Sequence, residues 1–208
     1  MKKLTVFAAA GVALVTLSSC SMGGSAQRSV DPQVVERYVQ STFGKAPPEW
    51  QARIKQDETQ KICTQFRNDP PADDYEKITQ RELAGVVYPA DGKLLGDWKA
   101  GEAIAQNGRG GQFSDAPNTV SGGNCYACHQ MAAKELSFGT IGPSLLHYGK
   151  ERKYDPAEAR NAFTKVYNAQ AFVACSNMPR FGHSKILNEK QIKDVVAYLF
   201  DPASPVNQ

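Results

Sequence analysis

The sequence contains few of the residues from which most metal and redox centres are built. It has five cysteines and three histidines in 208 residues, and only one short stretch brings the two types together. No alternation of apolar and polar residues is sustained along the chain, which disfavours a fold made of β-sheets. No Ser-His-Asp set or paired-carboxylate motif is recognisable, so nothing in the sequence indicates a hydrolytic or group-transfer site of its own.

The chain also lacks a strong charge of either sign. Its formal net charge is +3, and Lys2 and Lys3 supply two of these charges within a leader-like segment, so the rest of the chain carries +1. A charge this small leaves no basic field that would attract nucleic acid. The composition therefore gives no support to a nucleic-acid binder.

The first twenty residues, MKKLTVFAAAGVALVTLSSC, have the composition of an export signal. Two lysines precede an apolar run from Leu4 to Leu17, which is typical of a secretory signal peptide and short for a membrane span. The run ends in LSSC, which resembles a bacterial lipobox, so we expect a lipoprotein-type signal peptide over residues 1–19 and a lipid-modified Cys20. Ordinary cleavage a few residues later, for instance after Ala26, is the alternative. Both interpretations predict a periplasmic protein, and only the first attaches it to a membrane, through a lipid on Cys20.

Apolar residues recur at helical spacing in three segments of the N-terminal half. Asp31-Pro32 is a typical helix start and Gly44 a typical stop. A second helix is expected to open at Pro47-Pro48 and to continue as far as Phe66. A weaker third helix is expected around Tyr75 and Ile78.

From residue 96 the pattern changes. Asp97 precedes WKAGEAIAQNG, a short amphipathic segment, and Asn188 precedes EKQIKDVVAYLF, which Pro202 ends; both patterns predict helices. The sequence as a whole therefore predicts an all-α protein. Its expected parts are a flexible tether over residues 20–29, a helical extension over residues 30–95, and a main domain over residues 96–203.

The stretch GGNCYACHQM, residues 122–131, holds two cysteines three apart and a histidine directly after the second. Residues i and i+3 project to the same side of a helical turn, so Cys125 and Cys128 could both bond to one flat object. Thioether bonds to the two vinyl groups of a haem need that arrangement, and His129 could then bind the iron as proximal ligand. The spacing is the attachment signature of c-type haem and predicts one covalently bound haem c.

Zinc and a dithiol redox centre are the alternatives for the same motif. A zinc site would need a second pair of ligands with suitable spacing, and the remaining candidates are scattered: Cys63, Cys175, His147 and His183. A thioredoxin-like centre would need a strand–helix context around its two cysteines, which the sequence does not show.

The iron needs a sixth ligand or an open site. Met178 lies 49 residues after His129, in SNMPRFG, and we expect its thioether to be that ligand. Met131 follows the proximal histidine too closely to cross the ring. His183 is the alternative ligand, and His147 is expected to be structural.

Two cysteines remain once the haem motif and Cys20 are set aside. Cys63 and Cys175 form an even pair in a protein expected to be exported, and we predict a disulfide between them. Two independent buried thiols are the alternative.

Two further features match class I cytochromes c. In that class the first and last helices cross closely, with a glycine on the first facing an aromatic residue on the last, and Gly101 and Tyr198 resemble this pair. Ala105 stands where a second aromatic residue is usual. In the same class, the carbonyl of a proline in a G-P-x-L segment accepts the second ring proton of the proximal histidine, and Pro143 in GTIGPSL matches it.

Taken in order over residues 94–203, these motifs resemble those of the SoxX family, the monohaem class I cytochrome subunits of SoxAX complexes in bacterial thiosulfate oxidation. The resemblance implies a class I cytochrome c fold and a heterodimer with a SoxA-type cytochrome, which would hold the site where thiosulfate is joined oxidatively to a carrier protein's cysteine. This chain would pass electrons through His129, iron and Met178 to a small soluble cytochrome c. It would belong to an L-cysteine S-thiosulfotransferase without being catalytic alone.

Three other functions remain open at this point. One is a free-standing periplasmic lipoprotein cytochrome c that moves electrons between respiratory complexes. Another is the cytochrome subunit of a different periplasmic dehydrogenase. The third is a sensor or ligand-binding haem protein with a vacant distal site.

Overall fold

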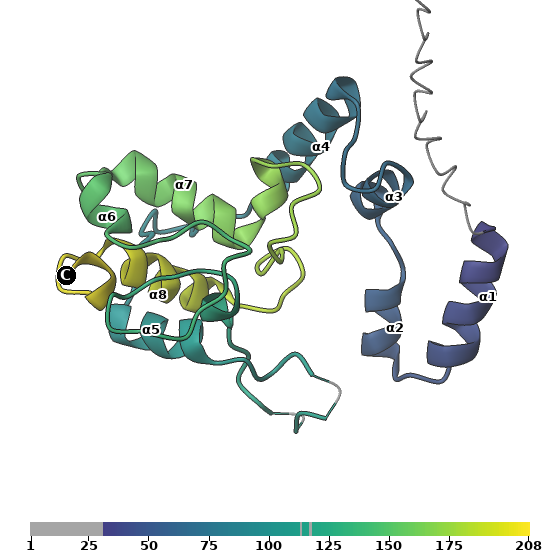
Figure 1. Ribbon diagram of the computed structural model, residues 1–208, viewed down its shortest axis with the longest axis horizontal. Helices are drawn as coiled ribbons and strands as arrows, with labels where there is room; N and C mark the ends of the chain where they lie inside the picture. Colours follow the sequence, from purple (N-terminus) through teal and green to yellow (C-terminus); the bar gives the residue numbers. More distant parts are fainter. Residues whose placement is uncertain (1–30, 113, 117) are drawn as a thin grey trace, which may run out of the picture. The chain divides into compact units, whose positions relative to one another are not determined.

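The structure is a computed structural model that describes residues 31–112, 114–116 and 118–208 (Figure 1). The predicted signal peptide, Cys20 and the tether lie outside the described residues. All regular secondary structure in the described part of the chain is helical, in agreement with the predicted fold class. None of the helices described there is long and apolar enough to span a bilayer.

The chain divides into two compact units, one ending at Ile54 and the other beginning at Lys55. The described part of the first unit is a helical hairpin of α1 (Pro32–Phe43) and α2 (Pro48–Ile54). The side chain of Asp31 accepts a hydrogen bond from the backbone of Gln33 at 2.8 Å and so starts α1 at the predicted position. None of the residues of α1 is buried, so its apolar stripe is exposed.

The prediction of one continuous helix from Pro48 to Phe66 is wrong, because the structure has two shorter helices there. Asp57 caps a separate helix, α3 (Glu58–Gln65): its side chain accepts from the backbone of Gln60 at 2.8 Å, and the Gln60 side chain accepts from the backbone of Asp57 at 3.0 Å. This reciprocal capping box satisfies two backbone donors at a new helix start. The break adjoins the boundary between the two units, so residues 55–95 pack in the same unit as residues 96–203.

The core of the second unit is the crossing of α5 (Trp98–Gln106) and α8 (Glu189–Phe200), which lie side by side in Figure 1. A Cβ added at Gly101 would lie 2.0 Å from the carbonyl oxygen of Asp194 and 2.8 Å from Cβ of Tyr198. Glycine is therefore required there for the backbones to approach so closely. The expected pairing of Gly101 with the fully buried Tyr198 is confirmed.

Two helices that the sequence analysis did not predict complete this core. The short α6 (Tyr148–Glu151) and the longer α7 (Pro156–Tyr167) both pack against α8 (Figure 1). Asp155 caps α7 through the backbone of Ala157 at 2.8 Å, the same Asp-Pro start that was recognised in α1. The inner face of α7 presents Phe163, which is fully buried and stacks on Tyr88 with ring centroids 5.7 Å apart.

The third predicted helix is present as α4 (Ala72–Ala84). It packs against the short 3-10 helix η2 (Ala169–Ala171), and Figure 1 shows the two beside each other. Ile78 of α4, Cys63 of α3 and the segment Ala174–Cys175 form a small hydrophobic cluster separate from the main core. Helices α3 and α4 are thus attached to the chain directly before Met178.

Candidate haem site

The motif segment is held in place by the two crossing helices. The backbone N–H of Gly123 donates to the carbonyl of Ile104 in α5 at 2.9 Å. The hydroxyl groups of Tyr126 and Tyr198 are 2.6 Å apart and share a buried hydrogen bond, which connects the motif to α8. Both helices therefore fix the position of the two cysteines.

The motif itself folds as a single tight turn. Asn124 adopts a left-handed conformation, with φ of 46°, and a 3-10 helix η1 (Cys125–Ala127) follows. The carbonyl of Cys125 accepts from the backbone N–H of Cys128 at 3.1 Å and from that of His129 at 2.9 Å. Two free thiols, both half-buried, and one imidazole thus extend from one turn of chain, as the spacing predicted.

The imidazole of His129 is oriented by the loop that carries Pro143. Its Nδ1 lies 2.7 Å from the Pro143 carbonyl oxygen. A carbonyl can only accept, so Nδ1 carries the proton and Nε2 keeps its lone pair free for a metal ion. The loop is pressed against the ring at Gly142, whose backbone also donates to the carbonyl of Cys128 at 2.9 Å.

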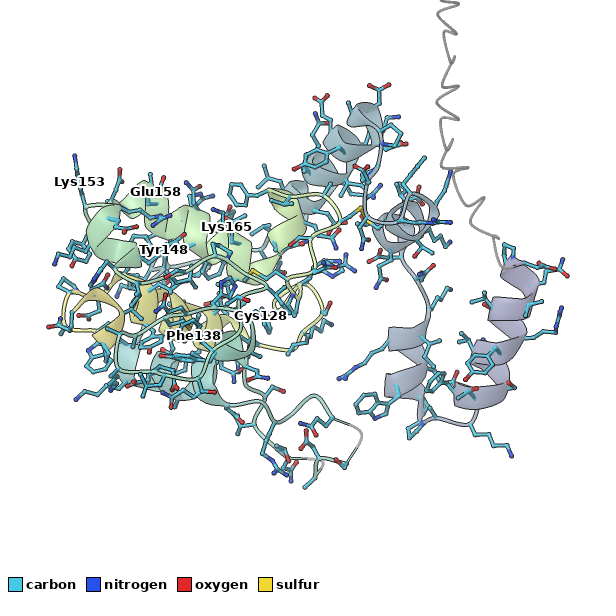
Figure 2. The ribbon with its side chains drawn as sticks, in the orientation of Figure 1. Cys128, Phe138, Tyr148, Lys153, Glu158 and Lys165 are labelled. Atoms are coloured by element: carbon cyan, nitrogen blue, oxygen red, sulfur yellow. A yellow bond between two sulfur atoms is a disulfide. The ribbon has the colours of Figure 1, made fainter. Side chains whose placement is uncertain are left out.

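The same loop surrounds the motif with apolar side chains that are left exposed. Gly139 donates to the carbonyl of Tyr126 at 2.8 Å, which places the residues before it next to the two cysteines. In this loop Leu136 is 92% exposed and Ile141 is 79% exposed, with Phe138 also accessible. Figure 2 labels Cys128 and Phe138 among the loops beside α5. The loop therefore offers apolar surface suited to a flat hydrophobic group.

The thiol of Cys125 has unsuitable electrostatics for a redox centre. Burial raises its pKa to about 12, and no cation stabilises the thiolate. A reactive dithiol needs a stabilised thiolate, whereas a thioether has no proton to lose. Among the described residues, no group of three or more His, Cys, Asp or Glu side chains is placed to hold a metal ion. The donor set therefore fits haem attachment better than either alternative.

Met178 is half-buried and packs against the main core. Its backbone N–H donates to the hydroxyl of Ser176 at 3.2 Å. Met131, by contrast, is 1% exposed and part of the core itself. Neither methionine lies in a helix, but of the two only Met178 is not enclosed by the core.

The two remaining histidines have other surroundings. His183 is exposed and lies near Asp57 and Glu82. Burial raises the pKa of both carboxyl groups, but hydrogen bonds and the charge of Arg180, with a smaller contribution from His183, outweigh it and lower the pKa. His147 adopts a left-handed conformation, with φ of 54°, and its backbone N–H donates to the carbonyl of Val206 at 2.7 Å. It thereby ties the start of α6 to the C-terminal segment.

The structure joins Cys63 to Cys175 in a disulfide, with their Cα atoms 5.4 Å apart. Beside it lies a group of buried polar residues that the sequence analysis missed. Arg180 forms ion pairs with Asp57 at 2.6 Å and with Glu82 at 3.3 Å. These partners are far apart in the sequence, and no spacing rule connects them.

Comparison with known proteins agrees with this geometry. The family model for cytochrome c matches residues 98–201, half of the chain. An uncharacterized lipoprotein of Aquifex aeolicus (strain VF5) is 34% identical over 186 residues, covering 88% of this chain and 87% of the relative. An alignment of that length includes much of the chain before residue 98. The chain belongs to the cytochrome c family and is a c-type cytochrome of the all-α class I fold, with a covalently bound haem c.

Proposed function

We propose that this chain is the single-haem electron-transfer subunit of a SoxAX-type complex, exported from the cytoplasm and anchored by a lipid at Cys20. The observation that carries electron transfer is the turn Cys125–His129, with two free thiols and the Nδ1 proton of His129 committed to Pro143. The order of the motifs over residues 94–203 supports the specific partner.

Each residue of the site has a separate role in this proposal. Haem c supplies a one-electron couple between ferrous and ferric iron. Cys125 and Cys128 would hold it through thioethers, and His129 would bind the iron through Nε2. The hydrogen bond to Pro143 keeps the ring in one orientation and increases the basicity of Nε2. Met178 would supply a soft thioether ligand, which favours ferrous iron and would raise the reduction potential.

The chemistry of the complex divides between two subunits. Joining thiosulfate to a carrier cysteine forms one sulfur–sulfur bond, and the thiol proton and two electrons leave. The partner holds the site where that bond forms. This chain accepts one electron at a time and passes each to a small soluble cytochrome c.

The composition of the surface around the motif favours a long-lived complex with a partner protein. Gly123–Gln130 and Met178–Gly182 carry few charged side chains, and Arg180 is 8% exposed and already paired. An apolar contact surface of this kind suits a lasting complex better than the charged docking ring of a shuttle.

A free-standing lipoprotein cytochrome c is the second candidate. The lipoprotein relative supports it, because the alignment extends well beyond the cytochrome domain. Both candidates are extracytoplasmic, and the proposed lipid on Cys20 is compatible with either. In the native host, Cys20→Ser should release the protein into the soluble fraction, whereas a mature N-terminus beyond residue 20 would contradict the lipid anchor.

Affinity purification from cells grown on thiosulfate separates the two candidates. A tag after Gln208, which is exposed, leaves the motif segment untouched. We expect a second haem protein of SoxA type to co-purify, and thiosulfate to reduce the haem only in the complex. Recovery of this protein alone, together with unaltered thiosulfate oxidation in a deletion strain, would contradict the SoxAX assignment and favour the free-standing carrier.

A further inference from the structure

The loop that carries Met178 is attached on both sides to helices outside the matched cytochrome region. Three residues before Met178, Cys175 is bonded to Cys63 of α3. Two residues after it, Arg180 is paired with Asp57 and Glu82. We infer that α3 and α4 form a clamp that positions the Met178 thioether and resists its displacement from the iron. The inference rests on the ligation proposed above.

The ion pair is the first half of the clamp, defined here by Asp57, Glu82 and Arg180. Arg180 is 8% exposed and Glu82 is 6% exposed, so the pair is largely removed from water. Nη2 of the guanidinium lies 2.6 Å from Asp57 and Nη1 lies 3.3 Å from Glu82. One guanidinium thus connects the start of α3 with the end of α4. Neutralising Glu82 would leave Arg180 paired only with Asp57, which is more exposed, and would break the connection to α4.

Glu82 is itself held by hydrogen bonds. It accepts from the Thr59 hydroxyl of α3 and from Nδ2 of Asn168 at 2.6 Å. Burial alone would raise the pKa of Glu82, but these hydrogen bonds and the nearby charge of Arg180 outweigh burial and lower it. The carboxylate is therefore ionised and fixed at neutral pH, so it can hold Arg180 in one position.

The disulfide is the second half of the clamp. Cys63 and Cys175 are both buried, in the small cluster that contains Ile78 of α4 and Ala174. Cys175 adopts a left-handed conformation, with φ of 59°, which few residues with a side chain adopt. The covalent bond and the packing together hold the chain at a point where its direction changes.

The two anchors leave very little free chain around the ligand. Only four residues separate Cys175 from Arg180, and Pro179 among them has a fixed φ. With both ends fixed, the backbone of Met178 can move away from the haem only if part of the clamp opens, so the sulfur is restricted to the positions that its side chain alone can reach. We call the conformation in which the Met178 sulfur has left the iron the open state. An external ligand can replace the thioether in this state, and the clamp lowers its population.

Imidazole binding to the ferric, haem-loaded, full-length protein measures that population directly. Imidazole competes for the position of Met178, so its apparent Kd falls as the open state becomes more populated. Glu82→Gln replaces one carboxylate oxygen by an NH2 group and keeps the other as an acceptor. The NH2 group must then face either the Thr59 hydroxyl or the Arg180 guanidinium, and both of these are donors in the wild type. Because the substitution removes a charge-assisted contact, we expect imidazole to bind about tenfold more tightly than to the wild type.

Asp194→Asn is the matched control. Asp194 is another buried carboxylate, paired with Lys190 at 2.7 Å and bonded to the backbone of Asp97 at 2.9 Å, and it has no contact with the clamp. It should leave the imidazole Kd within twofold of the wild type even though it lowers thermal stability. If the imidazole Kd changed as much in Asp194→Asn as in Glu82→Gln, the change would reflect lower stability of the whole fold. That result would overturn the inference.

Two further variants separate a failure of the clamp from a failure of the proposed Met178 ligation. Cys63→Ser, paired with Cys175→Ser, opens the other half of the clamp and should shift the imidazole Kd in the same direction, even if Glu82→Gln fails to fold. Met178→Ala should remove the weak iron–sulfur band from the ferric spectrum. If Met178→Ala leaves that band unchanged, the proposed ligation is wrong; if the band is lost but the clamp variants bind imidazole as the wild type does, only the clamp is wrong.

Discussion

Replacing Gly142 by alanine should alter the proximal ligand with little other effect. A Cβ at this position would lie 2.2 Å from Cε1 and 2.5 Å from Nδ1 of His129. Carbon atoms in contact normally lie at least about 3.5 Å apart, so the ring must move by more than about 1 Å. The φ of Gly142 is outside the left-handed region, so alanine adds no backbone strain.

The expected size of the effect follows from the hydrogen bond that this movement breaks. The bond from Nδ1 of His129 to the carbonyl of Pro143 is 2.7 Å long, and such a bond contributes about 1 kcal/mol. It increases the electron donation of Nε2, which stabilises ferric iron more than ferrous iron. Its loss should therefore raise the one-electron reduction potential by at most roughly 40 mV, the value reached if the bond acts on ferric iron alone, since about 59 mV corresponds to a tenfold change in the equilibrium constant.

Redox titration of the full-length, haem-loaded protein tests this effect. Gly111→Ala is the control, because a Cβ there meets no heavy atom within 4 Å and its φ is also outside the left-handed region. The potential should rise in Gly142→Ala and stay constant in Gly111→Ala. An unchanged or lowered potential in Gly142→Ala would refute the role assigned to the loop of Pro143.

Three further predictions concern the covalent bonds and the helix crossing. The haem should remain bound after acid–acetone extraction, and should be released when both Cys125 and Cys128 are replaced by alanine. Mass mapping without reduction should find Cys63 joined to Cys175, and replacing both by serine should lower the free energy of unfolding by about 5 kcal/mol in the chain-entropy model. Gly101→Ala should lower it by about 1–3 kcal/mol in chemical denaturation, because the strain of overpacking exceeds the gain of about 1 kcal/mol in helix propensity.

Features that depend on neighbouring residues were predictable from the sequence. The starts of α1 and α8 follow from Asp31 and Asn188, whose side chains cap the helix in the structure. The turn at Cys125–His129 follows from three residues within five positions. Gly101 was predictable for a different reason, because only glycine permits so close a helix crossing.

Features that depend on tertiary contacts were not predictable in this way. The stripe from Trp50 to Phe66 suggested one helix, but the capping box of Asp57 outweighs the continuity of the apolar pattern. The ion pairs of Arg180 connect residues 98 and 123 positions apart, and many exposed charges of the sequence could have formed them equally well. The missed α7 is different, since its Asp-Pro start was visible in the sequence.

The ferric near-infrared spectrum tests the central claim most directly, namely that Met178 completes the coordination of a haem held by Cys125, Cys128 and His129. Purified full-length wild type, Met178→Ala and His183→Ala should be compared under identical conditions. The weak iron–sulfur charge-transfer band should be present in the wild type and in His183→Ala and absent from Met178→Ala. A wild-type spectrum without the band, or loss of a ligand in His183→Ala but not in Met178→Ala, would contradict the account.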